Sequence, residues 1–250
     1  MSAHCLNCET PLQGSFCHHC GQKSSTHRIT FAKFVQHDLL HGIFHLDKGV
    51  LYTLKTLIYT PGYAARDFLK GRRVMHYNIF ALFIIIVALK TLVDLQISPE
   101  GVFYSDEKSV KQTDELINGA IQHYYKLFYL LSIPLLSCFS KLLFKKTSYN
   151  FVEHIVLNSF LLAGALFYSL LVSLFEFLTG ISTLEVYGAG FMVIYVLAGY
   201  YQATNGLYSF FDYLWRALLV VALFLLSLIL VLFAVIVFFY GGTFEGQISV

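Results

Sequence analysis

The chain has 250 residues, of which 57% are hydrophobic and 13% are charged, and its mean hydropathy is +0.65. Soluble domains carry about 25% charged residues, so this composition excludes an ordinary soluble domain and indicates several membrane spans. The formal net charge is only +2. That charge is too small to support nucleic-acid binding, and no nucleic-acid partner is expected.

Two cysteine pairs lie within the first twenty residues, in the pattern Cys5-x2-Cys8-x8-Cys17-x2-Cys20. The short turn inside each pair places two sulfur atoms on one edge of a tetrahedron, as in zinc ribbons. About twenty residues cannot bury a sufficient core, so a bound metal has to supply the folding free energy. The pattern predicts a structural Zn²⁺ held by four thiolates in a zinc ribbon over 1–28. Redox-active thiols and a mononuclear iron site are the competing interpretations.

The segment 29–76 is expected to form juxtamembrane amphipathic helices. Within it, His37, His41 and His45 recur every four residues, so on a helix they share one face. One interpretation is a second metal site, belonging to a metal-dependent membrane enzyme. Such a site needs further ligands from other helices, and the remaining distant histidines are not clustered. The other interpretation is an amphipathic helix whose polar stripe contains histidine.

Two short helical patterns follow, separated by Thr60-Pro61-Gly62. The first, over 47–59, is too short to cross a bilayer. We therefore expect the segment 31–73 to lie flat on the cytoplasmic leaflet, where its apolar side is buried and its charges stay in water. Basic residues of the second pattern are expected to contact anionic lipid headgroups. They are Arg66, Lys70, Arg72 and Arg73.

Three motifs stand in a fixed order before the first long apolar stretch. They are Phe-Cys-x2-Cys-Gly at Phe16–Gly21, then Asp47, Gly49, Thr53 and Leu54, then Pro61, Gly62, Arg66, Leu69, Lys70, Gly71 and Arg73. In this order they resemble an uncharacterised bacterial family of multi-span membrane proteins with a zinc ribbon, classed as a domain of unknown function. The resemblance covers roughly residues 5–97 and implies no known activity.

The remainder, 77–250, is expected to form a transmembrane helical bundle. A span needs about 20 mostly apolar residues. The expected fold class is an all-α integral membrane protein with about five transmembrane helices, preceded by the zinc ribbon and interfacial amphipathic helices. The fourth candidate span is the weakest, because three glycines dilute it. The candidates are Tyr77–Ile97, Tyr124–Phe144, Phe151–Leu178, Val186–Ala203 and Tyr213–Tyr240.

The distribution of lysine and arginine predicts the orientation, because short cytoplasmic loops are enriched in these residues. A cytoplasmic N-terminus places most of them inside, and only Lys108, Lys111 and Lys126 outside. Thiolate ligands require a reducing compartment, which independently favours the same orientation. We expect a multi-pass protein of the bacterial inner membrane with its C-terminus in the periplasm. The basic residues placed inside are Lys55, Arg66, Lys70, Arg72, Arg73, Lys141, Lys145, Lys146 and Arg216.

Several polar residues lie near the cytoplasmic ends of the candidate spans. They are interpreted either as one polar pocket that faces the cytoplasm or as ordinary interfacial polarity. The residues are His76, Asn78, Glu153, His154, Asn158, Gln202, Asn205 and Arg216.

The sequence contains no catalytic signature, so the expected function is non-catalytic. We expect an accessory or scaffold subunit that docks partner proteins at the membrane through its zinc ribbon. The expected partners are membrane lipids and proteins of the membrane or cytoplasm. One alternative is a protein that handles lipids or small solutes through the polar pocket and the basic segment 66–73. The second alternative is the histidine-based membrane enzyme.

Overall fold

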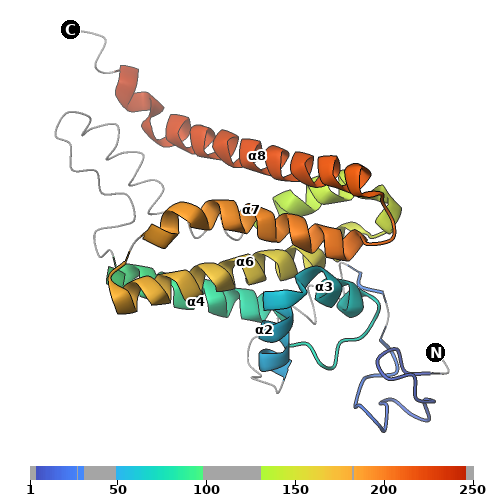
Figure 1. Cartoon of the computed structure of the whole chain (residues 1–250). Helices are drawn as coiled ribbons and strands as arrows, with labels where there is room; N and C mark the ends of the chain where they lie inside the picture. The colour runs from blue at the N-terminus through green and yellow to red at the C-terminus, as the bar shows by residue number, and fades with distance from the viewer. Residues whose placement is uncertain (1–3, 27, 31–48, 98–130, 182, 246–250) are drawn as a thin grey trace.

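The computed structural model describes residues 4–26, 28–30, 49–97, 131–181 and 183–245. In these ranges the secondary structure is helical, apart from two isolated β-bridges in the cysteine segment. The helices are α2 (Gly49–Tyr59), α3 (Pro61–Leu69), α4 (Ile79–Ile97), α6 (Phe151–Thr179), α7 (Thr183–Thr204) and α8 (Phe210–Glu245), with a further helical stretch over Leu131–Leu143 and a 3-10 turn, η2, at Lys145–Thr147 (Figure 1).

Three of these helices are long and apolar enough to cross a membrane: α4, α6 and the Phe210–Val231 part of α8. They coincide with the first, third and fifth predicted spans, and they confirm a helical protein with candidate membrane spans. The second predicted span is described only over its Leu131–Leu143 part, which is shorter than a span. Helix α7 coincides with the fourth predicted span, but it is not one of the three helices that are long and apolar enough to cross a membrane. A bundle of five spans therefore stays a prediction.

Helix α6 lies at the centre of the bundle. It begins with a capping box, in which the Asn150 side chain accepts a hydrogen bond from the Glu153 backbone and the Glu153 carboxylate accepts one from the Asn150 backbone. It ends at Gly180, whose φ of +70° suits glycine. Between these ends α6 is apolar on nearly every side. Its residues are mostly buried because α2, α3, α4 and α7 all pack against it.

Contacts between helices define the direction of each one. His76, just before α4, contacts Phe160 of α6, and Lys90 of α4 donates to Ser173 of α6, so α4 and α6 run parallel. The stretch Leu131–Leu143 and helix α7 both run antiparallel to α6, and α8 runs antiparallel to α7. Helices α4, α6 and α8 therefore begin at one end of the bundle, which we call the cysteine end, because the cysteine segment lies there (Figure 1).

Helices α2 and α3 pack against the bundle near the cysteine end. They bury Thr53 and Leu57 of α2 and Ala64 and Ala65 of α3, mainly against α6 and α7. The opposite face of α2 is exposed and carries Leu51, Tyr52, Lys55 and Tyr59. The sequence correctly predicted two short helices broken at Pro61. In the structure a protein surface covers one face of each helix, so lipid is available only to the other face.

The break between α2 and α3 is held by side chains of α6 and α7. The last carbonyl groups of α2 have no partner within the helix and would be costly to bury alone. Leu57 O accepts a hydrogen bond from Tyr195, Ile58 O accepts one from Tyr168 at 3.0 Å, and Tyr59 O accepts one from Gln202 at 3.3 Å. The Gly62 N–H donates to the Gln202 side-chain oxygen at 3.0 Å. The helix break is thereby hydrogen-bonded into the bundle.

Candidate metal centre and the cavity beside it

The four cysteines of the predicted zinc ribbon come together in the structure. Their sulfur atoms all lie within 4.8 Å of one another. The Sγ–Sγ distances are 3.6 Å for Cys5–Cys20 and 3.5 Å for both Cys8–Cys17 and Cys8–Cys20. A disulfide would bring two sulfurs to about 2.05 Å. Tetrahedral metal–sulfur bonds of about 2.3 Å place sulfurs roughly 3.8 Å apart, so the arrangement can hold a metal ion.

The two knuckles share one backbone pattern. The N–H of Glu9 donates to Cys5 O, and the N–H of Gly21 donates to Cys17 O, both at 2.9 Å. Glu9 and Gly21 directly follow the second cysteine of their pairs, and both have a positive φ, 62° and 78°. Glycine adopts this conformation without strain, whereas glutamate does not. The cluster therefore rests on a twofold repeat of one turn.

Hydrogen bonds from Thr10 lower the pKa of Cys8 to about 5, so this sulfur is a thiolate at neutral pH. Burial raises the pKa of the Cys20 thiol. Cys5 and Cys17 are 3% and 2% exposed. A metal with four protein ligands in such a site has no open position for a substrate, which is typical of structural sites.

Replacing Cys8 with serine is expected to remove the metal. Wild-type protein should carry one metal equivalent per chain, because the four thiols form one cluster. The variant should lose most of it, because three thiolates cannot complete the tetrahedron and the segment has no other core. Elemental analysis of purified protein measures this directly. The matched control is Cys138→Ser, an exposed thiol outside the cluster, which should keep the full equivalent. Full metal content in Cys8→Ser would contradict the site.

The cysteine segment is attached to the cysteine end of the bundle at several points. Leu6 packs against Gly71, where a Cβ would lie 2.7 Å from the Leu6 side chain. The backbone N–H of Arg73 donates to the Gln22 side chain at 3.2 Å. Further along, Arg28 makes a two-pronged ion pair with Glu153, with both N–O distances at 2.7 Å. The ribbon is thus joined to both α3 and the start of α6.

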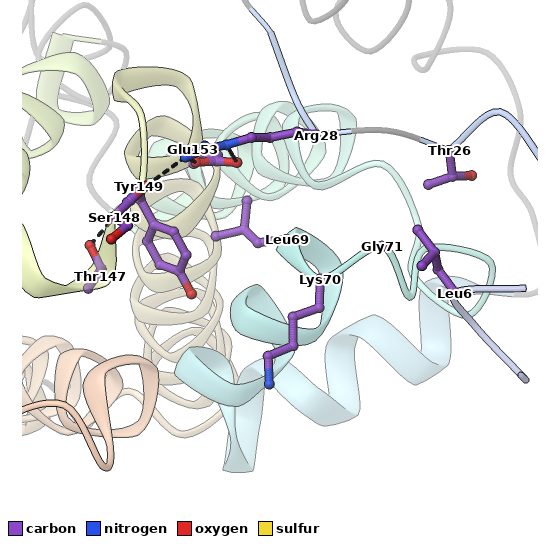
Figure 2. A pocket seen from close by; sticks show the side chains of 10 residues that line it. All are labelled: Leu6, Thr26, Arg28, Leu69, Lys70, Gly71, Thr147, Ser148, Tyr149 and Glu153. Carbon is purple, nitrogen blue, oxygen red and sulfur yellow. Dashed lines mark hydrogen bonds and ion pairs between the residues drawn. The ribbon is translucent and has the colours of Figure 1, made fainter. Parts of the chain in front are cut away.

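A cavity of about 350 Å³ lies between the cysteine segment, the end of α3 and the loop that precedes α6 (Figure 2). Apolar side chains and backbone form part of its wall, and charged and hydroxyl groups form the rest. Its lining residues are Leu6, Thr26, Arg28, Leu69, Lys70, Gly71, Thr147, Ser148, Tyr149 and Glu153.

The four basic residues predicted to contact lipid headgroups differ in their surroundings. Lys70 lines the cavity. Arg66 donates to the Asn205 carbonyl at 3.2 Å, and Arg72 approaches Asp67 at 3.7 Å on the surface. The Arg73 guanidinium donates to Phe68 O and stacks over the Phe68 ring. Contact with lipid stays a prediction for all four.

Two of the predicted pocket residues, His154 and Asn158, belong to one buried hydrogen-bonded cluster. His154 Nδ1 lies 2.9 Å from the Ser140 hydroxyl, and the Asn158 amide donates to both Ser137 and Ser140. Tyr200 of α7 donates to the Asn158 carbonyl oxygen. All five side chains are at most 1% exposed, so the cluster joins three helices and does not form an open pocket.

The other six predicted pocket residues lie in separate places. Glu153 pairs with Arg28, and Arg216 pairs with Asp212 at 2.6 Å. Gln202 makes its hydrogen bonds at the break between α2 and α3. The Asn205 side chain donates to the Tyr63 hydroxyl, and the Asn205 carbonyl accepts from Arg66, both on α3. Asn78 accepts hydrogen bonds from the first N–H groups of α4. His76 packs against the rings of Tyr52, Phe68 and Phe160.

The surroundings of His76 change its ionisation. Burial lowers the pKa of His76 to about 4, so the ring is neutral at physiological pH. The predicted histidine site at His37, His41 and His45 lies outside the described residues, as do Lys108, Lys111 and Lys126, the lysines predicted to lie outside the cell.

The sequence reasoning missed Ser137, Ser140, Tyr200 and Arg28. The two serines are three residues apart, and His154 and Asn158 are four apart, so each pair shares a helix face. These spacings could have indicated that the four polar side chains face one another in a buried cluster. Arg28 lies at the predicted boundary of the ribbon. The residues around it do not indicate that it pairs with Glu153, which is 125 residues away.

These features define a class: a helical protein with candidate membrane spans and, at one end of its bundle, a four-cysteine cluster that could hold a metal ion. Comparison with protein families adds one match. Residues 47–91 match the model of a family described as protein of unknown function (DUF3667), and the match covers α2, α3 and the first part of α4. No curated protein and no solved structure matches the chain.

Proposed function

We propose that this protein is a non-catalytic scaffold of the bacterial inner membrane that docks a partner protein through a cytoplasmic zinc ribbon. The observation that carries the proposal is the attachment of the four-cysteine cluster to the bundle at several points. Gln22, Arg28 and Leu6 hold the ribbon in place, while Phe16 remains 56% exposed and His18 and His19 are also exposed. A fixed module that presents an exposed aromatic side chain is suited to recognition of another protein.

Zinc is the ion that fits the donor set best. Four thiolates in two Cys-x2-Cys turns favour a tetrahedral d¹⁰ ion without redox chemistry. Such a site supplies folding free energy and offers no position for a reacting group. The buried Ser140–His154 pair does not provide a catalytic alternative, because Asn158 and three packed helices enclose it.

Photo-crosslinking from the ribbon tests the scaffold. A photoreactive residue at Phe16 should give one discrete protein adduct in intact cells. The same residue at Tyr59, which is 70% exposed on α2, should not give that adduct. Introducing Cys8→Ser should abolish the adduct from position 16, because the ribbon unfolds. Absence of any discrete adduct from position 16 would contradict docking through the ribbon.

We propose a cytoplasmic location for the cysteine end of the bundle, on the basis of its basic residues and its thiolates. In a Cys138→Ser background, a cysteine at Ile181 should react with a membrane-impermeant reagent added outside cells, because Ile181 is exposed at the other end of α6. A cysteine at Lys145 should react only after the cells are permeabilised. The reverse pattern of labelling would invert the topology.

A further inference from the structure

The cavity between the cysteine segment and the bundle has features of a binding site. Its volume of about 350 Å³ is at the lower end of the range for small-molecule pockets. Residues from three separate segments of the chain line it: Arg28 of the ribbon, Lys70 at the end of α3, and Tyr149 in the loop before α6 (Figure 2). Gly71 has a φ of +99° and lets Leu6 approach closely, which closes one wall.

The charge of the cavity is positive once its internal ion pair is counted. Among the described residues that line the cavity, Glu153 is the only acidic one, and both of its carboxylate oxygens accept hydrogen bonds. Glu153 Oε1 accepts a hydrogen bond from Arg28 Nε. Glu153 Oε2 accepts hydrogen bonds from a terminal nitrogen of Arg28 and from the Asn150 backbone N–H. All three distances are 2.7 Å. The Arg28–Glu153 pair is neutral overall. The ammonium group of Lys70 is then the uncompensated charge of the lining.

Hydrogen-bond donors accompany this charge. Figure 2 shows the Lys70 and Tyr149 side chains extending in the same direction, with the ammonium and hydroxyl groups at their tips. Burial raises the pKa of Tyr149, so the phenol stays protonated and can donate. Both residues line the cavity, and an ammonium and a phenol on one lining are complementary to an anion with several acceptor oxygens.

We propose that this cavity binds a phosphate group, with Lys70 and Tyr149 as donors and the neutral Arg28–Glu153 pair as part of the wall. The phosphate can belong to an anionic lipid headgroup, because the cavity lies at the end of the bundle where α4 and α6 begin. It can also belong to a small soluble phosphate compound, because Lys70 and Ser148 are exposed to solvent. The inference does not depend on the scaffold function.

The test uses full-length, metal-loaded protein in two arms. In the first, phosphatidylglycerol is titrated into protein held in a phosphate-free detergent, and bound lipid is counted by native mass spectrometry. In the second, inorganic phosphate and glycerol 3-phosphate are titrated by calorimetry into protein in the same detergent. Saturable binding in the first arm only identifies a lipid headgroup, and saturable binding in the second identifies a soluble phosphate.

Two variants and two matched controls assign the binding to the cavity. Lys70→Gln should weaken it at least tenfold, and Tyr149→Phe should weaken it severalfold. Lys55→Gln and Tyr59→Phe alter the same residue types on the exposed face of α2 and should bind like wild type. Metal content shows that each variant is folded, and Tyr149→Phe alone suffices if Lys70→Gln fails this check. Lack of saturable binding in both arms, or equal losses in the controls, would overturn the proposal.

Discussion

Replacing Gly62 with alanine is expected to lower the free energy of unfolding by about 3 kcal/mol, which corresponds to about 6–12 °C in the midpoint of thermal unfolding. A Cβ at this position would lie 2.0 Å from the Gly199 carbonyl oxygen and 2.7 Å from the Ala203 nitrogen. Both are backbone atoms of α7 and cannot rotate away. Helix α3 would have to move off α7, which breaks the Gly62–Gln202 hydrogen bond at the α2–α3 break.

The matched control is Gly190→Ala on α7, where no heavy atom lies within 4 Å of the added Cβ. Alanine is the better helix former by about 1 kcal/mol, so this variant should be as stable as wild type or slightly more stable. Thermal unfolding of detergent-solubilised protein, followed by size-exclusion chromatography, measures both. Equal melting of Gly62→Ala and wild type would show that α3 does not pack this closely on α7.

Replacing Asn158 with leucine is expected to lower the free energy of unfolding by about 2–4 kcal/mol. Asn158 is fully buried and binds Ser137, Ser140 and Tyr200, which lie on two other helices. Hydrogen bonds between helices in membrane bundles contribute about 0.6 kcal/mol each on average and up to about 1.7. Leucine removes three of them and leaves the Tyr200 hydroxyl buried without its acceptor, which adds to the loss.

A double-mutant cycle distinguishes this network from simple packing. Tyr200→Phe should cost less in the Asn158→Leu background than in wild type, because the hydrogen bond it removes is already gone. Ser159→Ala is the control on the same helix, because among the described residues the Ser159 hydroxyl donates only to Ile155 O of α6. Its effect should stay within about 0.5 kcal/mol. Additive losses for Asn158 and Tyr200 would refute the coupling.

Features with a local cause were predictable from sequence. The Cys-x2-Cys spacing predicted the cluster, and the apolar stretches located α4 and α6 to within two residues of their boundaries. Pro61 and Gly62 correctly marked the break between α2 and α3. What could not be predicted is which face of each helix meets which neighbour. Helices α4 and α7 are apolar nearly all round, so their sequences carry almost no record of orientation.

The polar residues show the same limit. Gln202 and Asn205 look like ordinary interfacial residues along the chain, yet their partners are about 140 positions away, at the α2–α3 break. Grouping polar residues by depth in the membrane suggested one pocket. The structure instead distributes them among helix caps, ion pairs and the Asn158 cluster, because each satisfies a specific backbone or side-chain group near it.

The Glu153 carboxylate closes the capping box of α6 and also receives Arg28 from the segment that follows the metal cluster. The order of the cysteine segment and the stability of the bundle are consequently linked through one side chain. Such coupling is reciprocal. If metal binding orders the ribbon and thereby stabilises the start of α6, then a partner that stabilises the start of α6 raises the metal affinity of the ribbon by the same factor. A partner that binds this end of the bundle and stabilises the start of α6 would raise the metal affinity without contacting a cysteine. Removal of the metal by a chelator would in turn lower the affinity for such a partner.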